Sequence, residues 1–408
     1  MPYLTPTAIE NRVTSLALAH STVCAQVALP NLTHEGATVH YLKIAKGAGA
    51  SRPKVLITAG IHAREWAPPD AVLAFTTKLL EAYKRKDPIK FRAFTDTKPA
   101  SPITYPAWTL PARDVKQIVE RLTLYIVPCV NPDGRAWSMN TAGDRMWRKN
   151  RRPDPATGCI GVDINRNFNI AWDFEKYYNN TVLTDPLSHL AASKDPCDNQ
   201  VYIGPSAASE PETRNIESLV SSEGIKYFVD VHAYGRKIMY PWGLDKNQTI
   251  DPNQSFQNPS FDRNVAGVGG RDGSLGNAYA EYFPDAAPHR LLKKHQLLAT
   301  RMKASILKGA GADARAKSRS KYSVEPSLGI GYMATGVSDD FVFSRQILNS
   351  SLSPIFAFTI ECGSSSHGEG GFHPDNANIY PKIEREVHAA LSGLLTNLAA
   401  WVSPTASP

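Results

Sequence analysis

The sequence predicts a single α/β domain in which a central mixed β-sheet is flanked by helices and carries enlarged loops. Short apolar, β-branched runs alternate along the chain with segments of helical periodicity, which is the pattern of an α/β protein. The chain has 408 residues, 42% of them hydrophobic and 20% charged, so it can bury a large core. Strand-like runs continue on both sides of every polar stretch. We therefore expect one domain over residues 1–403 and a short tail at 404–408.

The elements can be read in chain order from periodicity and turn residues. Residues 6–20 are expected to be a helix, because Ile9, Val13 and Leu16 follow helical spacing and Thr7 is a candidate N-cap. A turn is expected at 131–134, where the sequence is Asn-Pro-Asp-Gly. Strands are expected at 27–29, 39–44, 54–58, 122–127, 227–231 and 355–360, and further helices at 71–84, 210–221 and 381–401.

Several long stretches do not fit regular structure. They are rich in Pro, Gly, Asn, Ser or other polar residues, and they comprise 86–114, 173–205, 245–290 and 309–326. Loops of this length are uncommon in compact domains and usually lie at the surface or rim of a site. We expect them to be the enlarged loops of this domain.

Charge and hydropathy exclude several classes of protein. The net charge of +7 comes from 45 basic and 38 acidic residues, a balance too even to indicate nucleic-acid binding. No run of 18 apolar residues occurs, so no membrane span is expected. The first 30 residues lack a basic segment followed by an apolar core, so they do not resemble a signal peptide. Either an exported form has been trimmed, or the protein stays inside the cell.

Metal-ligating side chains follow two of the predicted strands. His62 and Glu65 come just after the strand at 54–58, and His232 comes directly after the strand at 227–231. In open α/β sheets, functional residues gather beyond the carboxyl ends of the strands. Two histidines and one carboxylate would leave one position for water, as catalytic zinc requires. Taken alone, each of these histidines could equally be a hydrogen-bonded core residue.

The sequence resembles the zinc carboxypeptidases related to pancreatic carboxypeptidases A and B, from about Tyr3 to Trp401. The resemblance rests on motifs in the family's order. These are the first zinc segment at 61–66, the arginine segment at 145–149, the Asn-Arg segment at 161–167, the third-ligand strand at 230–232, the tyrosine loop at 331–340 and the general-base strand at 358–361.

The resemblance implies a role for each residue of the catalytic set. His62, Glu65 and His232 would bind one zinc ion per chain, with Asp163 orienting His62 from behind. Glu361 would act as the general base, because a carboxylate there can take a proton from water and pass it to the leaving amine. Arg148 would stabilise the developing oxyanion.

An exopeptidase must also hold a free α-carboxylate. The resemblance implies that Arg166 pairs with it through its planar fork, with Asn165 beside it. Tyr332 would close over the bound terminus, and Arg64 and Arg145 would line the approach.

Side-chain preference is expected to depend on the tyrosine loop. In the resembled family, an acidic residue seven positions after the tyrosine accompanies a preference for C-terminal Lys or Arg. That position is Asp339, and Ser327 upstream is small enough to leave depth for a long side chain. The neighbouring Asp340 is expected to point elsewhere.

The sequence therefore indicates a zinc-dependent metallocarboxypeptidase, a hydrolase that acts on peptide or protein C-termini as a monomer and has no nucleic-acid or membrane partner. Three alternatives remain open: a preference for hydrophobic C-termini, a non-catalytic peptide-binding relative, and an amidohydrolase of the same fold. The resemblance also implies a disulfide between Cys159 and Cys197, which favours a secreted protein. Cys129 and Cys362 are expected to be buried free thiols.

Overall fold

A computed structural model describes residues 3–47, 52–97, 102–184, 189–244, 290–316 and 320–402, together with the single residue 259. Most of the predicted loop at 245–290 and the expected tail at 404–408 lie outside this set. Among the helices that are described, none combines the length and the apolar character needed to cross a bilayer.

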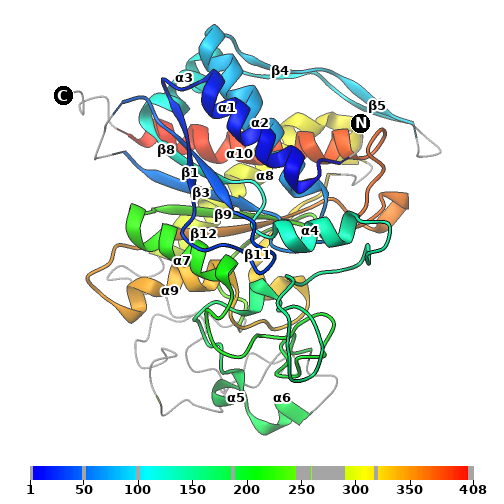
Figure 1. Ribbon diagram of the computed structural model, residues 1–408. Helices are drawn as coiled ribbons and strands as arrows, with labels where there is room; N and C mark the ends of the chain where they lie inside the picture. Colours follow the sequence, from blue (N-terminus) through cyan, green and yellow to red (C-terminus); the bar gives the residue numbers. More distant parts are fainter. Residues whose placement is uncertain are drawn as a thin grey trace.

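An eight-stranded mixed sheet runs through the middle of the molecule (Figure 1), as predicted. Its order is β1-β2-β8-β3-β9-β12-β10-β11. The four central strands β8, β3, β9 and β12 are parallel, and the strands toward both edges include antiparallel pairs. The strands are β1 (Cys24–Ala28), β2 (His40–Ile44), β3 (Lys54–Ala59), β8 (Thr123–Val127), β9 (Tyr227–Ala233), β10 (Lys237–Tyr240), β11 (Ser323–Pro326) and β12 (Phe356–Cys362).

Helices cover both faces of this sheet (Figure 1). They are α1 (Pro6–Ala19), α2 (Ala67–Arg85), α3 (Ala112–Arg121), α4 (Pro132–Met139), α5 (Phe174–Tyr177), α6 (Asn180–Thr184), α7 (Pro211–Glu223), α8 (Arg290–Ala316), α9 (Ser338–Leu348) and α10 (Tyr380–Trp401). Helices α2, α8 and α10 lie on one side of the sheet, and α7 and α9 lie on the other.

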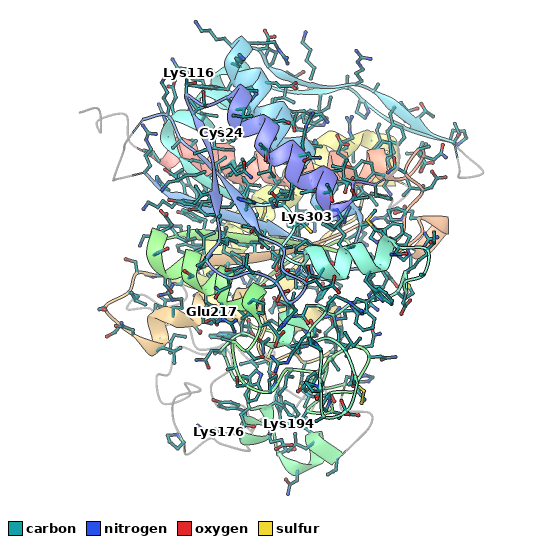
Figure 2. The ribbon with its side chains drawn as sticks, in the orientation of Figure 1. Cys24, Lys116, Lys176, Lys194, Glu217 and Lys303 are labelled. Atoms are coloured by element: carbon teal, nitrogen blue, oxygen red, sulfur yellow. A yellow bond between two sulfur atoms is a disulfide. The ribbon has the colours of Figure 1, made fainter. Side chains whose placement is uncertain are left out.

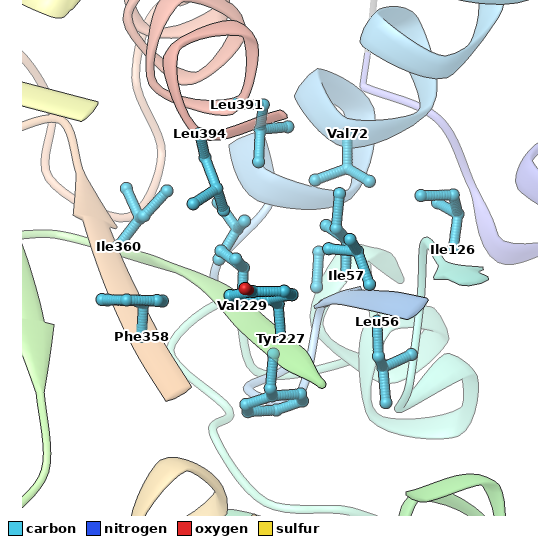
Figure 3. Close-up of a cluster of buried hydrophobic side chains, with 14 of the residues drawn as sticks. Leu56, Ile57, Val72, Ile126, Tyr227, Val229, Phe358, Ile360, Leu391 and Leu394 are labelled. Atoms are coloured by element: carbon cyan, nitrogen blue, oxygen red, sulfur yellow. The ribbon is translucent and has the colours of Figure 1, made fainter. Parts of the chain in front are cut away.

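The main core lies between the sheet and helices α2 and α10. Ile57 and Val229 are paired across β3 and β9, and both are fully buried. On the same side lie Val72 of α2 and Leu391 and Leu394 of α10 (Figure 3). Apolar side chains that leave water in this way stabilise the fold by about 25 cal/mol per Å² of buried surface. This packing holds the central strands, and therefore their carboxyl ends, in fixed positions.

Two local predictions are wrong. The N-cap of α1 is Thr5 rather than Thr7, and its hydroxyl accepts a hydrogen bond from the backbone N–H of Ala8. The segment 131–134 is not an isolated turn, because Asn131 caps helix α4 by accepting from the N–H of Gly134. An Asn-Pro pair favours an N-cap followed by the first helical position as well as a turn, so the local pattern fits both structures.

Two of the predicted loops contain more regular structure than expected. The stretch 86–114 forms two short ribbons, in which β4 (Ile89–Phe91) pairs with β7 (Trp108–Leu110) and β5 (Phe94–Asp96) pairs with β6 (Ile103–Tyr105). The stretch 309–326 holds the end of α8 and all of β11. By contrast, the described residues of 173–205 are largely irregular, and their helical residues are those of α5 and α6. There Lys194 bridges Asp173 and Glu175 at the end of the molecule opposite Lys116 (Figure 2).

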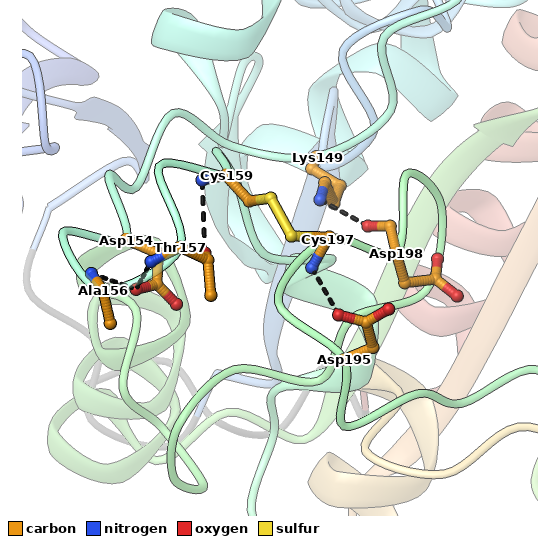
Figure 4. The surroundings of a disulfide bond; sticks show 8 residues. All are labelled: Lys149, Asp154, Ala156, Thr157, Cys159, Asp195, Cys197 and Asp198. Atoms are coloured by element: carbon orange, nitrogen blue, oxygen red, sulfur yellow. Dashed lines mark hydrogen bonds between the residues drawn. A yellow bond between two sulfur atoms is a disulfide. The ribbon is translucent and has the colours of Figure 1, made fainter.

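The cysteine predictions are confirmed. Cys159 and Cys197 form a disulfide that joins residues 38 positions apart (Figure 4). Cys129 and Cys362 are buried free thiols, as is Cys24. The disulfide lies among exposed polar turns, where Cys197 donates its N–H to Asp195 and Cys159 donates its N–H to Thr157. It therefore links two exposed polar turns that lie far apart in the sequence.

Candidate active site

The carboxyl ends of three neighbouring parallel strands meet at one edge of the sheet. Strand β9 lies between β3 and β12, so the segment after β3 comes close to the ends of the other two. His232 and Glu361 are register partners on β9 and β12. After β3 the chain turns sharply at Gly60, whose φ is +72° and where a Cβ would lie 2.9 Å from Pro69. A glycine there lets the chain bring His62 back toward β9.

His62, Glu65 and His232 converge in a buried cluster. Nδ1 of His62 lies 2.6 Å from Oε1 of Glu65, and Nδ1 of His232 lies 3.1 Å from Oε2. The two Nδ1 atoms are 3.1 Å apart, and all three side chains are buried. Two imidazole nitrogens and a carboxylate aimed at one point are the donor set of a catalytic zinc site. The residues present therefore fit a zinc ion.

Each histidine also has an aspartate behind it. Nε2 of His62 lies 3.3 Å from Oδ1 of Asp163, and Nε2 of His232 lies 2.9 Å from Oδ2 of Asp230. The sequence predicts this position for Asp163, and the structure adds Asp230. The signal for Asp230 was present in the sequence, because residues two apart on a strand point to the same face.

The charges of this cluster shift the pKa of its carboxyl groups in opposite directions. Although burial raises the pKa of Glu65, the neighbouring His62 and His232 outweigh it and hold the pKa below its usual range. Burial, together with the nearby charge of Glu65, raises the pKa of Glu361 to about 7. Oε2 of Glu361 is buried and has no hydrogen-bond partner among the described residues. Glu361 is thus a carboxylate that is poised to take up a proton.

Arg148 lies beside the cluster and is buried. Its Nε donates to Oδ2 of Asp163 over 2.9 Å, so the same aspartate lies behind His62 and holds this guanidinium. Burial alone would lower the pKa of Arg148. The charge of Asp163 outweighs this effect, so that the pKa lies above its ordinary value. A fixed positive charge next to the histidines is a suitable donor for a developing oxyanion.

A cavity of about 270 Å³ opens over the cluster. Most of the predicted site residues line it, namely His62, Arg64, Glu65, Arg148, Asn165, Arg166, Tyr332, Asp339 and Glu361. The guanidinium of Arg166 lies 5.7 Å from the ring of Tyr332. Its Nε donates to the carbonyl of Ala191 and its Nη1 to the carbonyl of Asn165, which fixes the orientation of the fork.

The two arginines expected along the approach occupy different places. Arg64 lines the cavity, stacks 4.2 Å from the ring of Phe372 and donates to Gln200 over 2.6 Å. Arg145 is not among the lining residues. It is exposed, and its guanidinium lies 4.9 Å from the ring of Trp66. Sequence reasoning missed Gln200, which anchors Arg64 and carries no local motif.

Asp339 and Ser327 meet at one wall of the cavity. The hydroxyl of Ser327 donates to Oδ2 of Asp339 over 2.5 Å, and both side chains are buried. Burial raises the pKa of Asp339, and the hydrogen bond from Ser327 opposes that shift. Asp340 points elsewhere and accepts the backbone N–H of Gly243. The cavity thus contains one buried acidic group away from the metal-ligating cluster.

Comparison with known proteins gives a family match over most of the chain. A family model described as zinc carboxypeptidase matches residues 9–389. Carboxypeptidase B of Astacus astacus is 32% identical over 223 residues, which are 54% of this chain and 58% of that protein. Zinc carboxypeptidase A 1 of Drosophila melanogaster is 29% identical over 265 residues, 62% of this chain and 50% of that protein. The chain spans about half the length of the curated relatives it matches.

Solved structures share the fold. Thrombin activatable fibrinolysis inhibitor superposes with a TM-score of 0.66 at 19% identity, over 98% of this chain and 75% of that one. Carboxypeptidase A from Helicoverpa armigera superposes with a TM-score of 0.63 at 21% identity, over 98% of this chain and 74% of that one. Similarity at this level of identity concerns the architecture alone.

Proposed function

This chain belongs to the zinc carboxypeptidase family, and we propose that it is a zinc-dependent exopeptidase that releases C-terminal Lys or Arg from peptides. The observation that carries the proposal is one cavity lined by His62 and Glu65 of the metal-ligating cluster, by Glu361 and Arg166, and by Asp339. His232 lies beside His62 and Glu65 in that cluster. A metal-ligand set, a base, a cationic clamp and a counter-charge are the parts such a reaction needs.

The residues would divide the work as follows. His62, Glu65 and His232 would hold a zinc ion. When bound, such an ion acts as a Lewis acid and lowers the pKa of its water to about 7. Glu361 accepts a proton from the attacking water and delivers it to the leaving amine. Arg148 donates to the oxygen on which negative charge develops.

Arg166 would select a chain terminus over an internal peptide bond. Its guanidinium can pair with a free α-carboxylate, and a planar fork suits a carboxylate better than a point charge does. Asn165 and Tyr332 stand beside it in the same cavity. An internal peptide bond offers no carboxylate, so the clamp favours cleavage of the last residue only.

Asp339 supports the preference for a basic side chain. A Lys or Arg side chain that enters the cavity loses water, which costs free energy unless an opposite charge is present. The buried carboxylate of Asp339 supplies that charge, and the small Ser327 leaves room in front of it. The relatives include enzymes named both A and B, so preference for hydrophobic C-termini is the competing assignment.

Hydrolysis of blocked dipeptides with varied C-terminal residues tests the proposal. We expect kcat/KM to be highest for C-terminal Arg and Lys, and we expect amidation of the terminus to abolish cleavage. Faster cleavage of Phe or Leu would support the competing assignment. Cleavage of the amidated peptides would contradict the role of Arg166.

The disulfide also supports export, and we propose an extracellular site of action.

A further inference from the structure

Asp230 is a buried carboxylate in the middle of the sheet. It lies on β9, two residues before His232, and its side chain has no exposure to solvent. Thr58 of β3 donates its hydroxyl to Oδ1 over 2.8 Å. Ser338 of α9 donates its hydroxyl to Oδ2 over 2.8 Å. The same Oδ2 lies 2.9 Å from Nε2 of His232. Groups from two strands and one helix therefore converge on this carboxylate.

Such a group is costly to bury. A carboxylate that leaves water is tolerated only when hydrogen bonds and opposite charge replace its hydration. Packing alone does not call for a charge here, because Phe228, the preceding residue on the same face of β9, is apolar and fully buried. The carboxylate is therefore explained by what it contacts, not by the packing of the sheet.

Ser338 extends these contacts toward the substrate cavity. It is the first residue of α9, and its backbone N–H donates to Oδ1 of Asn165 over 2.8 Å. The next residue of the helix is Asp339, which lines the cavity. The N-terminal turn of α9 is thus held at one point by Asp230 and at another by Asn165.

We propose that Asp230 is a positioning residue that orients His232 and fixes the start of α9, so that it couples the metal ligands to the pocket for the C-terminal side chain. The inference rests on the proposed function, because it takes His232 as a zinc ligand and Asp339 as the selecting residue. Nε2 of His232 lies close to Asp230, but among the described residues it has no partner with the geometry of a hydrogen bond. Asp230 therefore acts on the ring through its charge and close contact.

The contact of Asp230 with His232 and its contact with Ser338 can be tested separately by substitution. Asp230→Asn keeps the shape and removes the charge, so it should weaken zinc binding by about 10–100-fold, the usual effect of losing a group that orients a metal ligand. Ser338→Ala leaves the contact between Asp230 and His232 in place. It should keep zinc affinity near that of the wild type and reduce the kcat/KM ratio for C-terminal Arg over Leu.

The measurements are zinc affinity by chelator competition, the absorption spectrum of the cobalt-substituted enzyme, and kcat/KM for the Arg and Leu substrates. Thr58→Val is the matched control, because it removes the hydroxyl that donates to the other oxygen of Asp230, and that hydroxyl is bonded to residues of β9 other than His232. A merely structural role would lower the thermal midpoint of all three variants without changing the cobalt spectrum.

The outcomes separate this inference from the proposed function. A wild-type protein that binds no zinc and cleaves no peptide would refute the function. A wild type that does both, with Asp230→Asn retaining its zinc affinity and cobalt spectrum, would refute the inference alone. Equal effects of Thr58→Val and Asp230→Asn would also refute it. If Asp230→Asn does not fold, Ser338→Ala decides, and an unchanged Arg-to-Leu ratio overturns the coupling.

Discussion

The carboxylate of Glu361 differs from its neighbours in having a buried oxygen with no hydrogen-bond partner among the described residues. A base that must accept a proton gains nothing from a permanent donor on the accepting oxygen. Glu361→Gln should therefore leave the fold and the zinc content intact. It should lower kcat by about 10²–10⁴-fold, the usual contribution of general base catalysis. Steady-state kinetics with metal analysis of the same sample checks this.

The pH profile gives a second view of the same residue. Burial and the charge of Glu65 raise the pKa of Glu361 from 4.5 to about 7, and a bound cation would lower it again. A base works only when it is deprotonated, so kcat/KM should fall as the pH drops through a value between these two limits. A Gln variant that keeps more than a tenth of the wild-type kcat, or the same acidic limb, would identify another base.

In the proposed function Asp339 selects between substrates, so its substitution should change the ratio of kcat/KM values for two substrates more than the overall rate. Asp339→Leu removes the counter-charge, and a basic side chain would then be buried without a partner. Loss of one partner of a buried charge pair costs about 2–5 kcal/mol, so kcat/KM for C-terminal Arg should fall by about 30-fold to several thousand-fold. Cleavage of C-terminal Leu should rise.

Asp340→Asn is the natural control for this experiment. Asp340 accepts the N–H of Gly243 and does not line the cavity, and an amide oxygen can accept the same hydrogen bond. The Arg-to-Leu ratio should stay close to that of the wild type. An Asp339→Leu variant with an unchanged ratio would remove the basis for basic preference and leave the family assignment in place.

At the scale of single residues, the sequence located the groups of the site better than it located their partners. His62, Glu65 and Glu361 follow or end apolar strands, and that position can be read directly. The contact of Arg64 with Gln200 joins residues far apart in sequence, so no local pattern reports it. Arg145 lies in the predicted segment but stacks on Trp66, because nearness along the chain does not determine where a long side chain points.

At the scale of elements, the buried central strands could be predicted, whereas β10 and β11 at one end of the sheet could not. β3, β9 and β12 are buried along nearly their whole length and rich in apolar residues, because they are covered on both faces. β10 and β11 have four residues each, too few to show a period. β11 is half-buried along its length and ends in Pro326. Helix α8 ends in a stretch that Gly309 and Gly311 make look irregular, and Gly311 does adopt a non-helical conformation there.

The disulfide closes a long loop between two exposed turns. Cys159 and Cys197 close a loop of 38 residues, and cross-linking a loop of that size reduces the entropy of the unfolded chain by an amount worth about 3–4 kcal/mol. The double variant Cys159→Ser/Cys197→Ser should lose about that much free energy of unfolding in urea. Conversion of Cys24 to Ser removes a buried free thiol and serves as the control for loss of a sulfur atom.

Mass mapping provides the complementary observation. Alkylation of the unreduced, unfolded protein should label Cys24, Cys129 and Cys362 and leave Cys159 and Cys197 unlabelled. Labelling of all five cysteines without reduction would show that the bridge is absent in solution. It would also remove the main support for an extracellular site of action.

At the scale of the whole molecule, one sheet edge gathers residues from positions 62 to 361 of the chain. That arrangement follows from strand order, since β3, β9 and β12 are parallel neighbours although long segments separate them in sequence. Periodicity predicts each strand but not which strands are adjacent. The resemblance to the zinc carboxypeptidases implied which residues share the site, which is why the site could be anticipated from the sequence.

Because the three proposed zinc ligands come from two separate segments, His62 and Glu65 after β3 and His232 on β9, zinc should stabilise the whole fold as well as enable catalysis. A ligand that binds only the folded state adds RT ln(1 + [L]/Kd), about 4 kcal/mol at a thousand times Kd. Dialysis against a chelator should abolish activity and lower the thermal midpoint, and one equivalent of zinc should restore both. His232→Ala should show a low midpoint that zinc does not raise, since two ligands remain. A chelated protein that keeps full activity, or a midpoint that zinc raises equally in His232→Ala, would refute the assignment of these three residues as the metal site.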